Sequence, residues 1–161
     1  MYSLSEDGGG LTRPHQASRQ KRRALGSPTI SEKPHMLSDA TITAFLATTN
    51  PARSKGFYNE TLGFRLVSDD QFAIAFDCNG IELRIQKVAQ VLPHPFTALG
   101  WRVPDVREAV LGLVTRGVTF ERYSFLEQDK NGVWQAPSGA RVAWFKDPDG
   151  NLLSLTERGA A

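Results

Sequence analysis

The sequence is poor in the residues that form cross-links and metal centres. It contains one cysteine, Cys78, so no disulfide can form within the chain, and a reducing, cytoplasmic location is expected. Its three histidines are His15, His35 and His94. No stretch approaches the roughly 18 uninterrupted apolar residues of a membrane helix, so we expect no membrane association. These shortages exclude disulfide scaffolds and bilayer-spanning proteins.

The chain also lacks a glycine-rich phosphate loop and a nucleic-acid-binding module, so no nucleic-acid partner is expected. With 161 residues, 40% apolar and 22% charged, it has the composition of one soluble domain. Charge is unevenly spread, because residues 1–38 hold six basic against three acidic side chains and few large apolar ones. We therefore predict a disordered tail at 1–38 and a single domain at 39–159.

The tail has more than one interpretation. Its basic run at 20–23 suits contact with nucleic acid or a targeting role, but a plain solvated tail fits the same residues because no aromatic side chains interleave with them. Met36 offers a further interpretation, in which the chain starts there and the tail has no function.

From residue 41 the order strand, helix and three strands occurs twice. In the first unit, 41–87, Asn50 is the expected N-cap, Pro51 the first helical residue and Gly63 the helix stop. The Asn79-Gly80 pair suits a tight hairpin. The strands of this unit are predicted at 41–47, 64–68, 72–77 and 81–87.

The second unit, 97–157, repeats this order with a longer connection. Asp105 and Glu108 form a capping box at the start of its helix, and Gly117 ends it. The extra residues fall at 124–139, which we interpret as a loop and a candidate lid. The strands of this unit are predicted at 97–103, 119–123, 141–146 and 151–157.

Neither unit is large enough to have a core of its own, so we expect the two to share one across the short linker 88–96. Each unit offers a sheet with a helix on one face. The predicted class is α+β, with two βαβββ repeats and helices on the outer faces.

Three groups of residues resemble the vicinal oxygen chelate superfamily, which includes glyoxalase I, bleomycin resistance proteins, methylmalonyl-CoA epimerase and extradiol dioxygenases. The groups are residues 52–58 with Leu62-Gly63-Phe64, residues 80–83, and residues 145–151 with their Asp-Pro-Asp-Gly turn. The resemblance covers residues 40–158. It implies that the mixed sheets are cup-shaped.

Enzymes of that superfamily hold a divalent metal in the cup, with one ligand from the first and one from the last strand of each unit. The resemblance places these positions at Thr43, Glu82, Ala98 and Ser154. Only Glu82 is a conventional ligand, whereas a catalytic ion takes about three. No histidine lies in a predicted strand. We therefore expect no metal and no other cofactor.

Glu82 alternates with Arg84 and should face the cup, while Leu83 and its apolar neighbours pack under the helix. Glu82 is then a general base or a hydrogen-bond acceptor for a ligand. Alternatively, Arg84 or Arg102 simply neutralises it. The two arginines are also a candidate clamp for an anionic group, since the guanidinium matches a carboxylate.

Apolar residues of the same strands are candidates for the wall of a pocket, and plain core is the alternative for each of them. Trp134 in the 124–139 loop is a candidate lid aromatic. Thr43 and Ser154 offer hydroxyls to a ligand oxygen. The predicted ligand-binding residues are Thr43, Phe45, Phe72, Ile74, Glu82, Arg84, Arg102, Trp144 and Ser154.

The resemblance and these residues together predict metal-independent binding of a small, partly apolar molecule, in the manner of bleomycin resistance proteins. One alternative is a glyoxalase-like lyase or isomerase that uses Glu82 as base or as its sole conventional metal ligand. Another is an interaction protein whose cups are filled by side chains. A homodimer is expected, with the small molecule as the only other partner.

Overall fold

The computed structural model describes residues 37–159 of the chain. The chain divides into two parts, Met1–Ser38 and Asp39–Ala161, and the described helices and strands all lie in the second part. The tail predicted at 1–38 therefore lies almost entirely outside the described residues. Within 37–159 no helix has the length and apolar character needed to cross a membrane.

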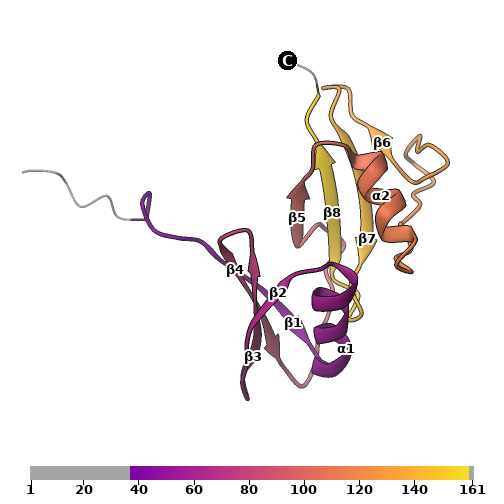
Figure 1. Cartoon of the computed structure of the whole chain (residues 1–161). Helices are drawn as coiled ribbons and strands as arrows, with labels where there is room; N and C mark the ends of the chain where they lie inside the picture. The colour runs from indigo at the N-terminus through magenta and orange to yellow at the C-terminus, as the bar shows by residue number, and fades with distance from the viewer. Residues whose placement is uncertain (1–36, 160–161) are drawn as a thin grey trace, which may run out of the picture. The chain divides into compact units, whose positions relative to one another are not determined.

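The first βαβββ unit forms a four-stranded mixed sheet with the order β1-β4-β3-β2 (Figure 1). The first strand runs parallel to β4, and the other neighbours are antiparallel. Asn79 and Gly80 both have positive φ in the two-residue hairpin between β3 and β4, as the Asn-Gly pair predicts. The strands are β1 (Thr43–Thr48), β2 (Arg65–Asp69), β3 (Ala73–Cys78) and β4 (Ile81–Lys87).

The helix of this unit begins as predicted and then widens. Asn50 caps α1 (Pro51–Gly56) by accepting a hydrogen bond from the backbone of Arg53. The chain continues as a π-helical turn, η1 (Phe57–Thr61), in which the Leu62 N–H donates to the Phe57 carbonyl at 2.9 Å. No motif identified in the sequence predicts this wider turn.

The second unit repeats the arrangement, with strand order β5-β8-β7-β6. Asp105 caps α2 (Val106–Val114) as predicted, accepting from the backbone N–H groups of Arg107 and Glu108. The two repeats confirm the predicted α+β class. The strands are β5 (Leu99–Arg102), β6 (Trp134–Gln135), β7 (Arg141–Lys146) and β8 (Leu152–Glu157).

The strand predicted at 119–123 is wrong. Only Phe120 forms a β-bridge, to Phe145, and its ring packs 5.4 Å from the Phe145 ring. The Gln128 side chain donates from Nε2 to the Glu121 carbonyl and accepts at Oε1 from the Tyr123 N–H. These two backbone groups therefore have hydrogen-bond partners without pairing to a neighbouring strand. The outer edge of β7 is shared instead: β6, from the segment predicted to be a loop, pairs with Val142 and Arg141, and the Glu121 N–H donates to the Trp144 carbonyl.

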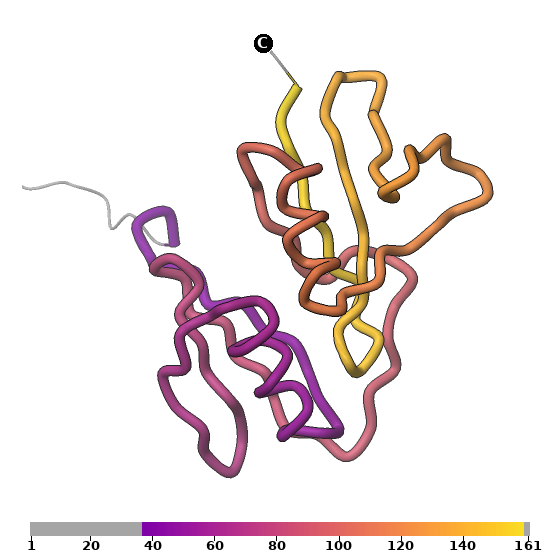
Figure 2. The backbone as a smooth tube through the Cα atoms, turned by 45° about the vertical axis from the view of Figure 1, so that its right-hand side comes forward, coloured from indigo at the N-terminus to yellow at the C-terminus, as the bar shows by residue number. Residues whose placement is uncertain are grey.

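The helix-covered faces of both sheets contribute to one hydrophobic core. Leu83 and Ile85 of β4 lie in it, together with Leu153 and Leu155 of β8. The linker runs from the first unit to the second past the turn between β7 and β8 (Figure 2), where Pro93 lies beside Gly150. The predicted common core is therefore present.

The Asp-Pro-Asp-Gly turn between β7 and β8 joins the second unit to the first by hydrogen bonds from buried side chains. Asp149 Oδ2 accepts from Thr48 Oγ1 at 2.6 Å and from Ser54 Oγ at 2.9 Å, and both hydroxyl residues are fully buried. Asp147 Oδ2 accepts from the buried Tyr58 hydroxyl at 2.7 Å. The turn thereby bonds the second unit to the first.

Candidate functional site

Strand register decides which predicted site residues share the open face of the first sheet. Thr43 pairs with Glu82, and Phe45 pairs with Arg84. These four residues therefore lie on the face opposite Leu83 and Ile85, as the alternation of β4 predicts. Phe45 is 54% exposed, so the face presents an uncovered aromatic ring.

The charges of this face are paired with one another. Arg84 Nη1 lies 3.0 Å from Glu82 Oε1, and Arg84 Nη2 lies 4.0 Å from Asp70 Oδ2. The backbone N–H groups of Ala73 and Phe72 lower the pKa of Asp70, and the charge of Arg84 adds a smaller effect. Of the alternatives for Glu82, the structure shows the contact with Arg84.

Two predicted pocket residues do not lie on this face. Ile74 pairs with Ile85 across the antiparallel strands. Because directly paired residues of antiparallel strands share a face, Ile74 lies with Ile85 in the core, where it is fully buried. Phe72 precedes β3 and is 69% exposed. Ala75, the partner of Arg84, holds the open-face position instead. The hairpin between β3 and β4 contained the signal for this correction, since its register links Ile74 to a strand face already assigned to the core.

On the second sheet, Trp144 and Gly100 both pair with Ser154 across the open face. The space beside Gly100 is so narrow that an added Cβ would lie 2.5 Å from Ser154 Oγ. Ala98 precedes β5 and donates its backbone N–H to Leu152. The residue next to Ser154 is therefore Gly100, two positions along from the one that the resemblance assigned.

Trp144 belongs to a cluster of four aromatic rings, which we call the aromatic cluster and define as Tyr123, Phe125, Trp134 and Trp144. The Trp144 ring lies 5.6 Å from Tyr123 and 6.1 Å from Trp134, and Tyr123 lies 5.4 Å from Phe125. Trp144 Nε1 donates to Thr97 Oγ1 at 3.1 Å, which fixes the indole plane. Phe125 is 78% exposed. The sequence identified Trp144 and Trp134 but not the other two rings.

Arg102 lies on the second sheet, whereas Arg84 lies on the first. No described carboxylate forms an ion pair with Arg102. Glu157, its neighbour in a cavity of about 380 Å³, pairs instead with Arg141 at 2.7 Å. The predicted arginine clamp therefore draws its two members from different sheets.

The four family metal positions offer few donors. Glu82 is held by Arg84, Thr43 and Ser154 offer hydroxyls, and Ala98 or Gly100 offers no donor atom. Among residues 37–159, no three side chains of His, Cys, Asp or Glu come together in a group able to hold an ion. These residues do not fit the divalent centre of the superfamily.

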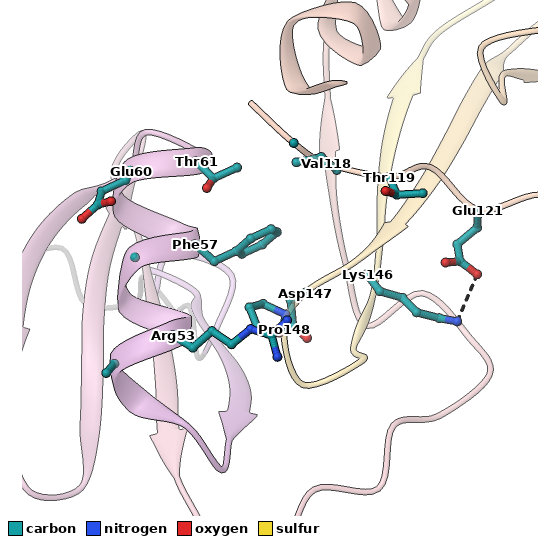
Figure 3. A pocket seen from close by; sticks show the side chains of 13 residues that line it. Arg53, Phe57, Glu60, Thr61, Val118, Thr119, Glu121, Lys146, Asp147 and Pro148 are labelled. Atoms are coloured by element: carbon teal, nitrogen blue, oxygen red, sulfur yellow. Dashed lines mark ion pairs between the residues drawn. The ribbon is translucent and has the colours of Figure 1, made fainter. Parts of the chain in front are cut away.

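A cavity of about 510 Å³ lies on the helix side, between α1–η1, residues 117–121 and the turn at 146–148 (Figure 3). None of the predicted site residues lines it. Arg53 and Glu60 carry opposite charges on its helical wall, and Lys146 pairs with Glu121 at 3.0 Å on the other side. Asp147 also lines the cavity, so three acidic residues stand against two basic ones and the charges do not balance.

Two βαβββ units with open sheet faces and outer helices define the class of this protein as a paired-βαβββ protein. The Glyoxalase/Bleomycin resistance protein/Dioxygenase superfamily matches residues 35–155, and the chain belongs to that superfamily. The predicted resemblance is confirmed. None of the curated proteins matches the chain in sequence.

Solved structures share this fold. A superfamily member from Sphaerobacter thermophilus is 26% identical, with a TM-score of 0.59 over 73% of this chain and 96% of that one. A lactoylglutathione lyase from Agrobacterium tumefaciens is 16% identical, with a TM-score of 0.57 over 74% and 93%. A glyoxalase/bleomycin resistance protein/dioxygenase from Nocardioides is 18% identical, with a TM-score of 0.59 over 83% and 89%.

Proposed function

We propose that this protein binds a small, partly apolar molecule on the open faces of its sheets, without a metal ion. The observation that carries the proposal is the aromatic cluster on the second sheet. It lies beside Ser154, which occupies a metal-ligand position of the superfamily, and beside Gly100, which pairs with Ser154. Aromatic side chains with a few polar groups are the usual lining of small-molecule sites. The hydrogen bond from the Trp144 indole to the Thr97 hydroxyl restrains the orientation of this ring before a ligand binds.

A second copy of the chain completes this site in our proposal. Phe45 on the first sheet and Phe125 in the second unit are more than half exposed, although large aromatic residues are normally covered. Among residues 37–159, no strand or helix forms an outer layer on the open face of either sheet. A homodimer that sets the first sheet of one copy over the second sheet of its partner would cover these rings and bring Arg84 and Arg102 to one ligand.

The glyoxalase-like alternative depends on Glu82. Its Oε1 atom is occupied by Arg84, so an incoming substrate would have to displace the guanidinium before that oxygen accepts a proton. A likeness in fold to a lactoylglutathione lyase does not supply the missing donors. We therefore favour binding without chemistry.

Native mass spectrometry and metal analysis of the purified protein test the proposal. We expect a dimer that carries a co-purified small molecule, with no stoichiometric divalent ion. Trp144→Ala should release the adduct, and Leu111→Ala on the exposed side of α2 should retain it. A stoichiometric ion that Glu82→Gln removes, together with a turnover lost with the ion, would overturn the proposal.

A further inference from the structure

A separate cavity, about 220 Å³ in volume, lies on the helix-covered side, where the two units meet. Leu62 and Phe64 of the first unit form one wall. Leu113 of α2 and Trp101 of β5 form the others. This cavity lies across the second sheet from the aromatic cluster, because Trp101 and Trp144 occupy opposite faces of that sheet.

The lining of this cavity is apolar and fixed. Its floor is formed by Phe145, which is fully buried, and by Leu155, which is 5% exposed. The Trp101 ring lies 5.5 Å from Phe64 and 6.4 Å from Phe145, so three rings hold one another in place. A ligand here would meet preformed aromatic surfaces.

No charged side chain is expected to face the interior of this cavity. Among the described residues, Arg102 is the one charged member of its lining, but it pairs with Thr156, whereas Trp101 pairs with Leu155. Neighbouring residues of a strand point to opposite faces, so the Arg102 side chain belongs to the open face and only its backbone borders the cavity. A charged ligand would lose its hydration without gaining a partner.

The size of the cavity selects the ligand further. An apolar cavity of about 150 Å³ lined by Leu, Ile and Phe stays dry and takes up benzene. This cavity is larger and partly open to solvent, with a comparable lining, so it accommodates a substituted ring. A ligand that fills it would remove apolar side-chain surface from water.

We infer that this cavity is a second binding site, independent of the open-face site, for a small neutral molecule with one aromatic or alicyclic ring. The site spans both units, because Leu62 and Phe64 come from the first and the remaining lining from the second. Occupancy should therefore stabilise the contact between the units and raise the unfolding temperature.

Tryptophan fluorescence tests this inference with bromobenzene as the probe, since bromine quenches an indole that it contacts. The chain has three tryptophans, so Trp134→Phe with Trp144→Phe leaves Trp101 as the only tryptophan reporter. We expect saturable quenching of Trp101. Adding Leu113→Phe, which fills the cavity, should abolish the saturable phase. Adding Leu111→Phe should preserve it, because Leu111 is 53% exposed on the same helix.

Quenching that rises linearly without saturation, or that is equal in the Leu113→Phe and Leu111→Phe proteins, would overturn the inference. A crystal of the unaltered protein under xenon pressure gives an independent test that does not depend on a variant folding. Xenon density between Trp101 and Leu155 supports the site, and its absence there counts against it. Neither result depends on the aromatic cluster, so this site and the proposed function stand or fall separately.

Discussion

Replacing Asp149 tests whether the turn between β7 and β8 fixes the two units together. Its carboxylate accepts four hydrogen bonds, from the hydroxyls of Thr48, Ser54 and Thr49 and from the Thr49 backbone. Thr48 and Ser54 are fully buried. In Asp149→Ala one of these two hydroxyls can donate to the other, since their oxygens lie 2.8 Å apart. The second hydroxyl proton then has no acceptor.

The magnitude follows from the strength of these bonds. Hydrogen bonds from the two buried hydroxyls to a charged group contribute about 1.5 kcal/mol each and the two exposed ones about 0.5 each, of which the Thr48–Ser54 contact recovers about 1. Asp149→Ala should therefore lower the free energy of unfolding by about 3 kcal/mol. Asp149→Asn keeps an acceptor oxygen and should lose about half as much.

Urea unfolding followed by tryptophan fluorescence measures this loss. Because m for small domains is about 1–3 kcal/mol per molar urea, the midpoint should fall by about 1 M or more at unchanged m. Glu127→Ala, at an exposed position, is the control and should leave the midpoint in place. A loss for Asp149→Ala no larger than that of the control would refute the role of this carboxylate.

The pH dependence of the same variants gives a further check. Burial alone would raise the pKa of Asp149, but the hydrogen bonds from Thr48, Thr49 and Ser54 outweigh it and lower the pKa below its ordinary value. Asp149 thus stabilises the folded state at pH above about 4, the ordinary aspartate value, and loses this effect as pH falls through its folded pKa. The difference between the parent and Asp149→Asn should narrow accordingly in acid.

The remaining predictions concern three buried or crowded positions. Tyr58→Phe removes the hydroxyl that donates to Asp147 and should cost about 1–2 kcal/mol in urea unfolding. Burial, followed by the nearby Asp147 charge, raises the pKa of Tyr58 well above its ordinary value, so the parent should lose stability above pH about 10, where the unfolded tyrosine ionises, and Tyr58→Phe should lose less. Gly100→Ala places a Cβ 2.5 Å from Ser154 Oγ and should lower the free energy of unfolding by about 1–3 kcal/mol. Adding Ser154→Ala should restore part of this loss, and a double variant no more stable than Gly100→Ala alone would contradict the clash. Burial, with a smaller effect of a neighbouring carboxylate, raises the pKa of the Cys78 thiol to about 11. Iodoacetamide should therefore alkylate Cys78 at pH 8 much more slowly than it alkylates free cysteine, and an equal rate would show that the thiol is not shielded.

The repeat of strand, helix and three strands was predictable because its signals are local. Asn50 and Asp105 act as N-caps, and Asn79-Gly80 takes the positive φ values that a two-residue hairpin needs. Capping and turn formation depend on residues a few positions apart, so the sequence determines them directly.

The candidate site was less predictable because its members meet through strand pairing. Ile74 was placed on the open face, but its register with Ile85 puts it in the core. Tyr123 was assigned to a strand, yet it joins the aromatic cluster because Gln128 satisfies the backbone there. Neither outcome is visible in the periodicity of a single segment.

The sequence by itself determined the βαβββ repeat, the shortage of metal donors and the motif of the Asp-Pro-Asp-Gly turn, since each depends on residue type and short spacing. Only the tertiary structure decided that Asp149 is held by Thr48 and Ser54, and that Arg84 neutralises Glu82. The cavity lined by Phe64 and Trp101 likewise exists only in the tertiary structure. These contacts join residues distant in sequence, and their geometry depends on how the shared core packs the two units.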